Sequence, residues 1–194
     1  MNYIKIDTED VCNGDGLRVV LWLSGCSHHC YNCQNPQTWD ANSGILFDES
    51  AKEELFKELN KDYISGLTLT GGDPLYEANL DGVLSLVNKI RLSLPEKTIW
   101  LYSGYKVEKI YNNKFILSPS AHDIANIEPD YIVVEESNKD RLRSEIISKC
   151  TVMVDGQYMD SKRDITLQWR GSSNQRVINV QQSIQKGEIV LWKS

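Results

Sequence analysis

The stretch Leu17-Arg-Val-Val-Leu-Trp-Leu-Ser-Gly-Cys26-Ser-His-His-Cys30-Tyr-Asn-Cys33 places an apolar run directly before three cysteines. Residues 17–24 are rich in β-branched and apolar side chains, which predicts a buried strand that ends at Gly25. The cysteines follow at once, at the spacing Cys-x3-Cys-x2-Cys, and so lie in the loop after the strand. The strand therefore delivers three thiols to one short segment of the chain.

Further strands and helices alternate along the chain after this loop. The patterns predict strands at 66–70, 98–102, 131–135, 151–154 and 189–192, helices at 48–59, 79–93, 140–149 and 180–186, and an irregular stretch at 112–128. Asp48 is the expected N-cap of the first helix. This alternation is typical of an α/β fold with a mostly parallel sheet and helices outside it. Because about six strands are fewer than the eight of a closed barrel, we expect a partial, open β/α barrel.

Three of the predicted strands end in loops that could bind a ligand. Cys26 follows the first, Gly71-Gly72-Asp73-Pro74 follows the second, and Ser103-Gly104 follows the third. In α/β folds, ligand sites lie at the carboxyl ends of the parallel strands. We therefore expect the three loops to share one rim of the sheet.

Composition narrows the class of protein. The 194 residues suit one domain, and a hydrophobic share of 41% is enough for a core. A net charge of -6 without a basic block argues against a nucleic-acid or anionic-membrane surface. No apolar run could span a bilayer, and the N-terminus lacks the pattern of a signal peptide. We therefore expect a cytoplasmic protein, in which clustered cysteines are more often metal ligands or catalytic groups than disulfides.

The cysteine triplet can surround one small object. A four-iron cubane normally takes four thiolates, so three would leave one iron open to a further ligand such as an amino acid. Structural zinc is the alternative, because His28 or His29 would complete a Cys3His site, although zinc ligands usually form two short pairs well apart. Three unrelated core cysteines are improbable on so polar a loop. We otherwise interpret both histidines as solvated loop residues, and expect neither Cys12 nor Cys150 to be a ligand.

The turn Gly71-Gly72-Asp73-Pro74 is the second candidate site. Two glycines let the backbone approach a ligand closely, and Asp73 with nearby carbonyl groups could hold a charged amine. An ordinary strand-to-helix turn would use the same residue types, but the cysteine loop upstream favours ligand binding. We expect Gly72→Val to impair cofactor binding more than cluster assembly, because a β-branched side chain would both fill the ligand's space and resist a positive φ.

The cysteine spacing and the glycine turn resemble those of the radical S-adenosylmethionine enzymes. The chain more closely resembles the family of activating proteins of anaerobic ribonucleoside-triphosphate reductase, and the likeness extends over much of its length. The stretches that carry it are Asn13–Arg18, Ser24–Cys26, Thr38–Trp39, Leu69–Leu75, Ile99–Tyr105, Val154–Gly156 and Trp169–Gln175. The last is the most specific to that family, whereas the cysteine triplet indicates only the superfamily.

The resemblance implies a single domain, 1–194, with a partial (open) β/α barrel of the radical S-adenosylmethionine type. It implies an enzyme in which a reduced [4Fe-4S] cluster cleaves S-adenosyl-L-methionine to methionine and a 5'-deoxyadenosyl radical. That radical would take a hydrogen from a glycine of the large glycyl-radical subunit of anaerobic ribonucleotide reductase. A low-potential electron donor such as flavodoxin would reduce the cluster, and a homodimer is compatible with the resemblance.

The resemblance also implies which residues form the site. The cluster ligands are Cys26, Cys30 and Cys33, the residues at the methionine end of the cofactor are Gly71, Gly72 and Asp73, and those near its adenosine end are Asn32, Cys33 and Gln34. Many superfamily members carry an aromatic residue directly before the third cysteine. Here Asn32 takes that position and Tyr31 stands one place earlier, so the backbone, rather than an aromatic side chain, is expected to serve at this position.

Two other functions stay open on the sequence alone. One is a different radical enzyme, either the activase of another glycyl-radical enzyme or one that acts on a small molecule. The other is a non-enzymatic zinc-binding interaction module. The segment Trp169–Gln175 favours the reductase activators. The segment itself has two possible roles. It is either a polar turn that closes the sheet edge, or a surface where Arg170 and Asn174 hold the partner's glycine loop or the cofactor.

Overall fold

The computed structural model describes residues 1–118 and 137–193. Its strands and helices are β1 (Asn2–Asp10), β2 (Arg18–Leu23), β3 (Ile45–Leu46), α1 (Glu49–Leu59), β4 (Gly66–Gly71), α2 (Leu80–Ser93), β5 (Thr98–Tyr102), β6 (Val107–Tyr111), β7 (Lys114–Leu117), α4 (Asn138–Ser148), β8 (Val152–Asp155), β9 (Arg176–Asn179) and α5 (Val180–Lys186). No helix within these ranges is both long and apolar enough to cross a membrane.

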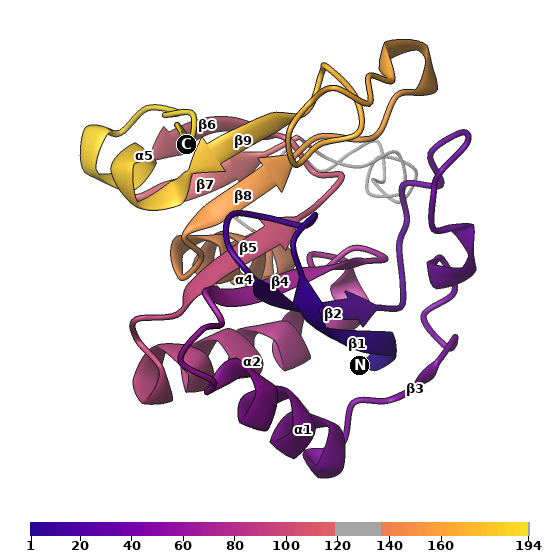
Figure 1. The fold of residues 1–194 in the computed structure, drawn as a ribbon. Helices are drawn as coiled ribbons and strands as arrows, with labels where there is room; N and C mark the ends of the chain where they lie inside the picture. The colour runs from indigo at the N-terminus through magenta and orange to yellow at the C-terminus, as the bar shows by residue number, and fades with distance from the viewer. Residues whose placement is uncertain (119–136, 194) are drawn as a thin grey trace.

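One sheet organises the described part of the chain. Its strand order is β3-β1-β2-β4-β5-β8-β9, and β6 with β7 forms a separate hairpin. Strands β2, β4, β5 and β8 are parallel neighbours, whereas β1 pairs antiparallel with β2, β3 with β1, and β9 with β8. The prediction of a mostly parallel α/β sheet is therefore confirmed, with antiparallel strands added at both edges (Figure 1).

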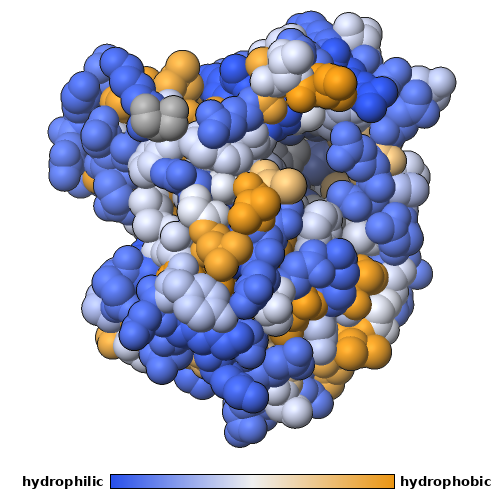
Figure 2. All heavy atoms as spheres, in the orientation of Figure 1, coloured by the Kyte–Doolittle hydropathy of each residue, from blue (hydrophilic) through white to orange (hydrophobic). Residues whose placement is uncertain are grey.

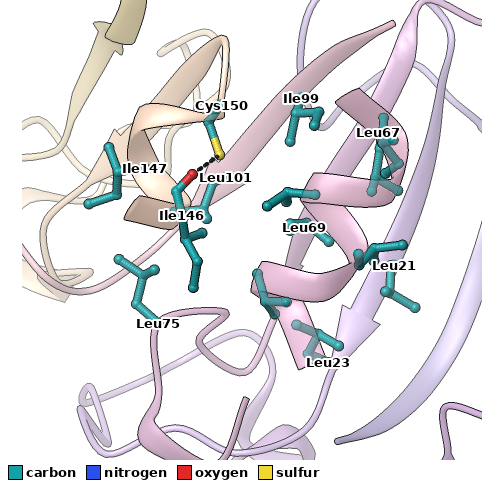
Figure 3. Close-up of a cluster of buried hydrophobic side chains, with 14 of the residues drawn as sticks. Leu21, Leu23, Leu67, Leu69, Leu75, Ile99, Leu101, Ile146, Ile147 and Cys150 are labelled. Carbon is teal, nitrogen blue, oxygen red and sulfur yellow. Dashed lines mark hydrogen bonds between the residues drawn. The ribbon is translucent and has the colours of Figure 1, made fainter. Parts of the chain in front are cut away.

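The helices cover one face of this sheet. Successive strand residues point to opposite faces, and Leu21, Leu69 and Leu101 belong to the large buried cluster that the helices complete. Figure 3 shows these leucines facing Ile146 and Ile147, next to Cys150, whose Sγ donates to the carbonyl oxygen of Ile146 at 3.3 Å. Cys150 is thus part of the core.

The other face of the sheet carries a buried cation and a group of tryptophans. Arg18 is fully buried, and its guanidinium donates to Thr68 Oγ1 at 2.7 Å and Thr98 Oγ1 at 2.9 Å. Burial lowers the pKa of Arg18 to about 10. Trp100, also buried, packs edge-on against Trp169, with ring centroids 4.9 Å apart. This contact brings the late segment 169–175 back over the sheet.

The helices α1, α2, α4 and α5 confirm the predicted ones within a few residues, and Asp48 caps α1 by accepting from the backbone N–H of Ala51. Strands β1, β3 and β9 and the hairpin were not predicted. In the hairpin, Asn112 and Asn113 have φ of 49° and 61°, the backbone of a tight two-residue turn, inside a stretch interpreted as irregular. The strand predicted at 189–192 is wrong, because only the bridge of Leu191 to Ile178 forms there. The strand predicted at 131–135 lies outside the described residues.

Asp155 joins three elements at the end of β8. Its carboxylate is fully buried, accepts from Arg176 Nε at 3.0 Å and from the backbone N–H of Val107 at 2.8 Å, and forms an ion pair with Arg176 Nη2. We expect Arg176→Ala to lower the free energy of unfolding by about 3 kcal/mol, because it leaves a buried carboxylate without its cation. Urea unfolding of the metal-free protein measures this. Lys106→Ala, which breaks only an exposed pair with Glu108, is the control and should change it by less than about 1 kcal/mol.

Candidate functional site

The carboxyl ends of the parallel strands meet at one cavity of about 490 Å³. The cavity is lined by the cysteine loop after β2, the glycine turn after β4, Ser103 and Gly104 after β5, and Gly156 after β8. The prediction that three loops share one rim is therefore confirmed, and β8 adds a fourth. Residues between 158 and 171, the orange overhang of Figure 1, line its outer side, and Figure 2 shows the surface hollowed beneath this overhang.

Cys26, Cys30 and Cys33 all line the cavity and are half-buried. The base of their loop is fixed by backbone hydrogen bonds, from Cys26 N–H to the Trp39 carbonyl at 3.0 Å and from Gly25 N–H to the Thr38 carbonyl at 2.7 Å. These bonds explain why Thr38-Trp39 belongs with the cysteine loop, although it lies beyond the third cysteine. Three thiols on one rim are thus brought together as the spacing predicted.

The thiols suit a cationic group. Burial, followed by the nearby Asp73, raises the pKa of Cys26 to about 12, although backbone N–H groups of His28 and His29 oppose the shift. Burial also raises the pKa of Cys30. A metal centre supplies the positive charge that turns such thiols into thiolates. Within residues 1–118 and 137–193, no three His, Cys, Asp or Glu side chains are arranged to hold a single metal ion.

The glycine turn is clamped against the base of the cysteine loop. Gly72 N–H donates to the Leu23 carbonyl at 2.8 Å, and Asp73 N–H donates to the Gly25 carbonyl at 2.7 Å. A Cβ on Gly72 would lie 2.4 Å from the Gly25 oxygen. Gly71, not Gly72, has the positive φ, at +102°. The positive φ expected at Gly72 is therefore wrong, and a glycine is required there because the Gly25 carbonyl approaches it closely.

This packing changes the expected result of Gly72→Val. The new side chain would push Gly25 and hence Cys26 away, so cluster assembly should fail together with cofactor binding, and the fold should lose about 3 kcal/mol or more. Iron content after anaerobic reconstitution and thermal unfolding measure the two effects. Gly187→Asn is the matched control, because Gly187 has φ +68° with open space around it, and asparagine tolerates that backbone. Full iron in Gly72→Val would contradict the clamp.

Asp73 lines the cavity, but other groups of the protein already contact its carboxylate. The side chain is 2% exposed, and its Oδ2 accepts from Ser103 Oγ and from Gly104 N–H, both at 3.0 Å. Oδ1 accepts from Leu75 N–H at 2.8 Å. Burial alone would raise the pKa of Asp73, but the contacts with His28 and these N–H groups outweigh it and lower the pKa below its ordinary value. The carboxylate is therefore charged and shared between two loops.

The two histidines of the cysteine loop have different surroundings. His29 is exposed, as predicted, and lies against Trp39 with ring centroids 4.8 Å apart. The prediction of a solvated His28 is wrong, because its side chain is only 3% exposed and its Nε2 lies 2.9 Å from Asp73 Oδ2. His28 does not lie in a segment with helical or strand periodicity, so no pattern predicts that it is buried. Its position between two cysteines is the only feature of the sequence that could have indicated a role.

The residues expected near the adenosine end lie on different sides of the loop. Gln34 lines the cavity, whereas Asn32 is exposed and is not among the described lining residues. Asn32 has φ 53°, a left-handed backbone that asparagine tolerates well. Tyr31 is 79% exposed, so the aromatic residue that stands one place early lies in solvent. Backbone strain thus explains the asparagine at this position without a ligand contact.

The segment Trp169–Gln175 is a polar turn that also lines the cavity. Gln175 Oε1 accepts from the N–H groups of Gly171 and Ser172 at 3.0 and 3.2 Å, and Arg170 Nη1 donates to the Gln175 carbonyl at 2.7 Å. Asn174 Nδ2 donates to the Gln157 carbonyl at 2.8 Å. Arg170, Gly171 and Gln175 face the cavity. The segment is therefore a closed polar turn, and several of its residues also line the cavity.

Cys12 is the unexpected member of the lining. This exposed residue follows β1, the strand that sequence reasoning missed, and so its place beside the cavity could not be predicted. The lining residues Tyr158, Arg163, Ile165 and Leu167 were missed as well. They belong to an irregular segment in which no periodicity or motif marks the inward side.

Comparisons with known proteins agree with this site. Residues 12–178 match the family model of the 4Fe-4S single cluster domain. The chain is 39% identical over 177 residues to the anaerobic ribonucleoside-triphosphate reductase-activating protein of Enterobacteria phage T4, covering 91% of this chain and 93% of that protein. It is 31% identical to the protein of the same name from Haemophilus influenzae, covering 90% and 96%, and 33% identical to that of Escherichia coli K12, covering 91% and 97%.

Proposed function

This chain belongs to the family of anaerobic ribonucleoside-triphosphate reductase-activating proteins, and from that premise we propose that it is the enzyme that activates such a reductase. The observation that carries the proposal is that Cys26, Cys30 and Cys33 line the same cavity as Gly71 and Gly72. A metal site that served only as a structural support would not need a glycine turn packed beside its ligands.

The proposed cofactors are a [4Fe-4S] cluster, held by Cys26, Cys30 and Cys33, and S-adenosyl-L-methionine. When bound, the cluster supplies the electron that splits S-adenosyl-L-methionine into methionine and a 5'-deoxyadenosyl radical, which takes a hydrogen atom from a glycine of the large reductase subunit. Three thiolate ligands would leave one iron of the cluster without a protein ligand, and the amine and carboxylate of the methionine end could bind there.

The protein's own groups would bind and orient the cofactor. We assign the methionine end to the turn of Gly71, Gly72 and Asp73, where backbone groups are accessible at the rim and the charged Asp73 is buried just behind them. Gln34, with the backbone at Asn32 and Cys33, is assigned to the adenosine end. Asn32 would act there through its main chain, since its side chain is exposed.

The cavity must exclude solvent and other C–H bonds while a primary alkyl radical exists. The segment 158–171 covers only its outer side, and the cavity remains hollowed to the surface in Figure 2. A large protein partner can close such an opening, and a small substrate cannot. This argument supports the large glycyl-radical subunit as the substrate.

The remaining parts of the proposal follow the family. The proposed fold is a single domain over 1–194 that forms a partial (open) β/α barrel on the parallel strands β2, β4, β5 and β8. The proposed electron donor is a low-potential protein such as flavodoxin. We further propose a cytoplasmic homodimer with no nucleic-acid or membrane partner. The net charge of -6 supports the last point.

One experiment tests the proposed function directly. The anaerobically reconstituted, reduced protein is mixed with S-adenosyl-L-methionine and the large reductase subunit, and a glycyl-radical doublet is sought by electron paramagnetic resonance. A doublet that disappears when the acceptor glycine is replaced with alanine supports the proposal. Cofactor cleavage without a doublet would favour another radical enzyme, and a colourless zinc protein would favour an interaction module.

A further inference from the structure

We propose that His28 is a positioning residue that locks the cysteine loop to the glycine turn through Asp73, so that the cluster ligands and the cofactor turn are held as one unit. The inference rests on the proposed iron–sulfur site and names a residue of that site with no previous role. His28 stands between Cys26 and Cys30, so its side chain fixes the middle of the cysteine loop.

The ring of His28 is held from several directions. Nε2 lies 2.9 Å from Asp73 Oδ2, a close polar contact that is not a hydrogen bond, and Nδ1 lies 2.9 Å from Gln157 Nε2. The ring packs edge-on against Tyr105, with centroids 4.8 Å apart. Asp73 follows β4, Tyr105 follows β5 and Gln157 follows β8. One imidazole therefore connects the loop after β2 to the ends of the three other parallel strands.

Gly104 provides the space for this ring. A Cβ at Gly104 would lie 2.3 Å from His28 Cδ2, so any other residue there would displace the imidazole. Gly104 also donates its N–H to Asp73 Oδ2 at 3.0 Å. Ser103 and Gly104 thus support the contact between His28 and Asp73 in two ways. Gly104 leaves room for the His28 ring, and both residues donate hydrogen bonds that fix the Asp73 carboxylate.

The remaining part of the cysteine loop has few other anchors. Tyr31 is 79% exposed and Asn32 is exposed, and the backbone bonds to Thr38 and Trp39 hold only the base at Gly25 and Cys26. The ring contact of His29 with Trp39 and the backbone N–H of Tyr158 at the Cys30 sulfur also hold this stretch, but neither joins it to the glycine turn. Without His28, the stretch that carries Cys30 would therefore be held less firmly relative to Gly71 and Gly72. A cofactor that must contact both the open iron and the turn would then lose its fixed geometry.

The inference predicts a loss of cofactor affinity with little loss of metal. In His28→Ala the three thiols remain, so iron content should stay close to that of the wild type, whereas affinity for S-adenosyl-L-methionine should fall about tenfold, the effect of one lost polar contact. In the metal-free protein, amide hydrogen exchange of residues 26–35 should accelerate by a similar factor. Exchange and affinity equal to wild type would overturn the inference.

Three further variants make the test specific. His28→Gln, whose amide can still reach Asp73, should recover most of the affinity, whereas the shorter His28→Asn should not. His29→Asn is the matched control, because His29 is exposed and its φ of 44° suits asparagine, and it should behave as wild type in both measurements. If His28→Ala does not fold, His28→Gln and His28→Asn test the contact instead. An equal loss of affinity for S-adenosyl-L-methionine in both variants would overturn the role of Asp73. If the wild-type protein assembles no cluster, the proposed function fails, while hydrogen exchange of the metal-free protein still tests the contact.

Discussion

Replacing any one of Cys26, Cys30 or Cys33 with alanine is expected to leave little or no iron bound after anaerobic reconstitution, against about four iron atoms per chain in the wild type. The three thiols share one cavity and are the only cysteines of the loop. With two thiolates, two irons of a cubane would lack a protein ligand. Iron and sulfide content, together with the visible absorption of the cluster, measure the loss.

The two other cysteines serve as matched controls. Cys150 is fully buried in the core, and burial raises its pKa to about 12, so its thiol stays protonated and Cys150→Ala should keep its iron. Cys12 is the sharper control because it lines the same cavity. If Cys12→Ser lost iron while Cys30→Ala kept it, the ligand set would be wrong. Retention of iron in Cys12→Ser would show that the loop, rather than proximity to the cavity, selects the ligands.

The rim of the site could be predicted from sequence because each parallel strand is an apolar run followed directly by a cysteine-containing or glycine-containing loop. The parallel neighbours β2, β4 and β5 bring those loops to one edge of the sheet. The antiparallel edge strands lack such marks. β1 mixes charged and apolar residues and is mostly half-exposed, so its pattern resembles a polar loop. β9 follows a polar turn and spans only four residues.

The contacts that hold the rim together could not be predicted. His28, Ser103 and Asp73 lie far apart in sequence, and their meeting depends on the strand order. Gly72 was identified correctly as a position that needs glycine, but for a ligand rather than for the carbonyl of Gly25. Sequence patterns report local backbone and burial, whereas a polar contact between two loops is set by the packing of the whole sheet.

The double variant Arg170→Ala with Asn174→Ala is expected to keep its cluster and slow uncoupled cofactor cleavage, but to form little glycyl radical on the reductase. Arg170 lines the outer side of the cavity, where the partner's glycine loop would enter. Asn174 lies in the same turn, and its Oδ1 has no hydrogen-bond partner in the described part of the chain. Such groups can bond the peptide groups of a flexible backbone.

The two steps separate the partner role from the structural one. Released 5'-deoxyadenosine reports cleavage, and the radical doublet reports transfer to the partner, which should fall by about tenfold or more if two polar contacts are lost. Both side chains also close the turn, through the carbonyl groups of Gln175 and Gln157. An iron-free or insoluble variant would therefore favour the purely structural role, and an unchanged radical yield would refute the partner role. The matched control is Arg141→Ala with Asn138→Ala, an exposed Arg–Asn pair on α4 joined by a 2.9 Å hydrogen bond, which should leave both signals at wild-type levels.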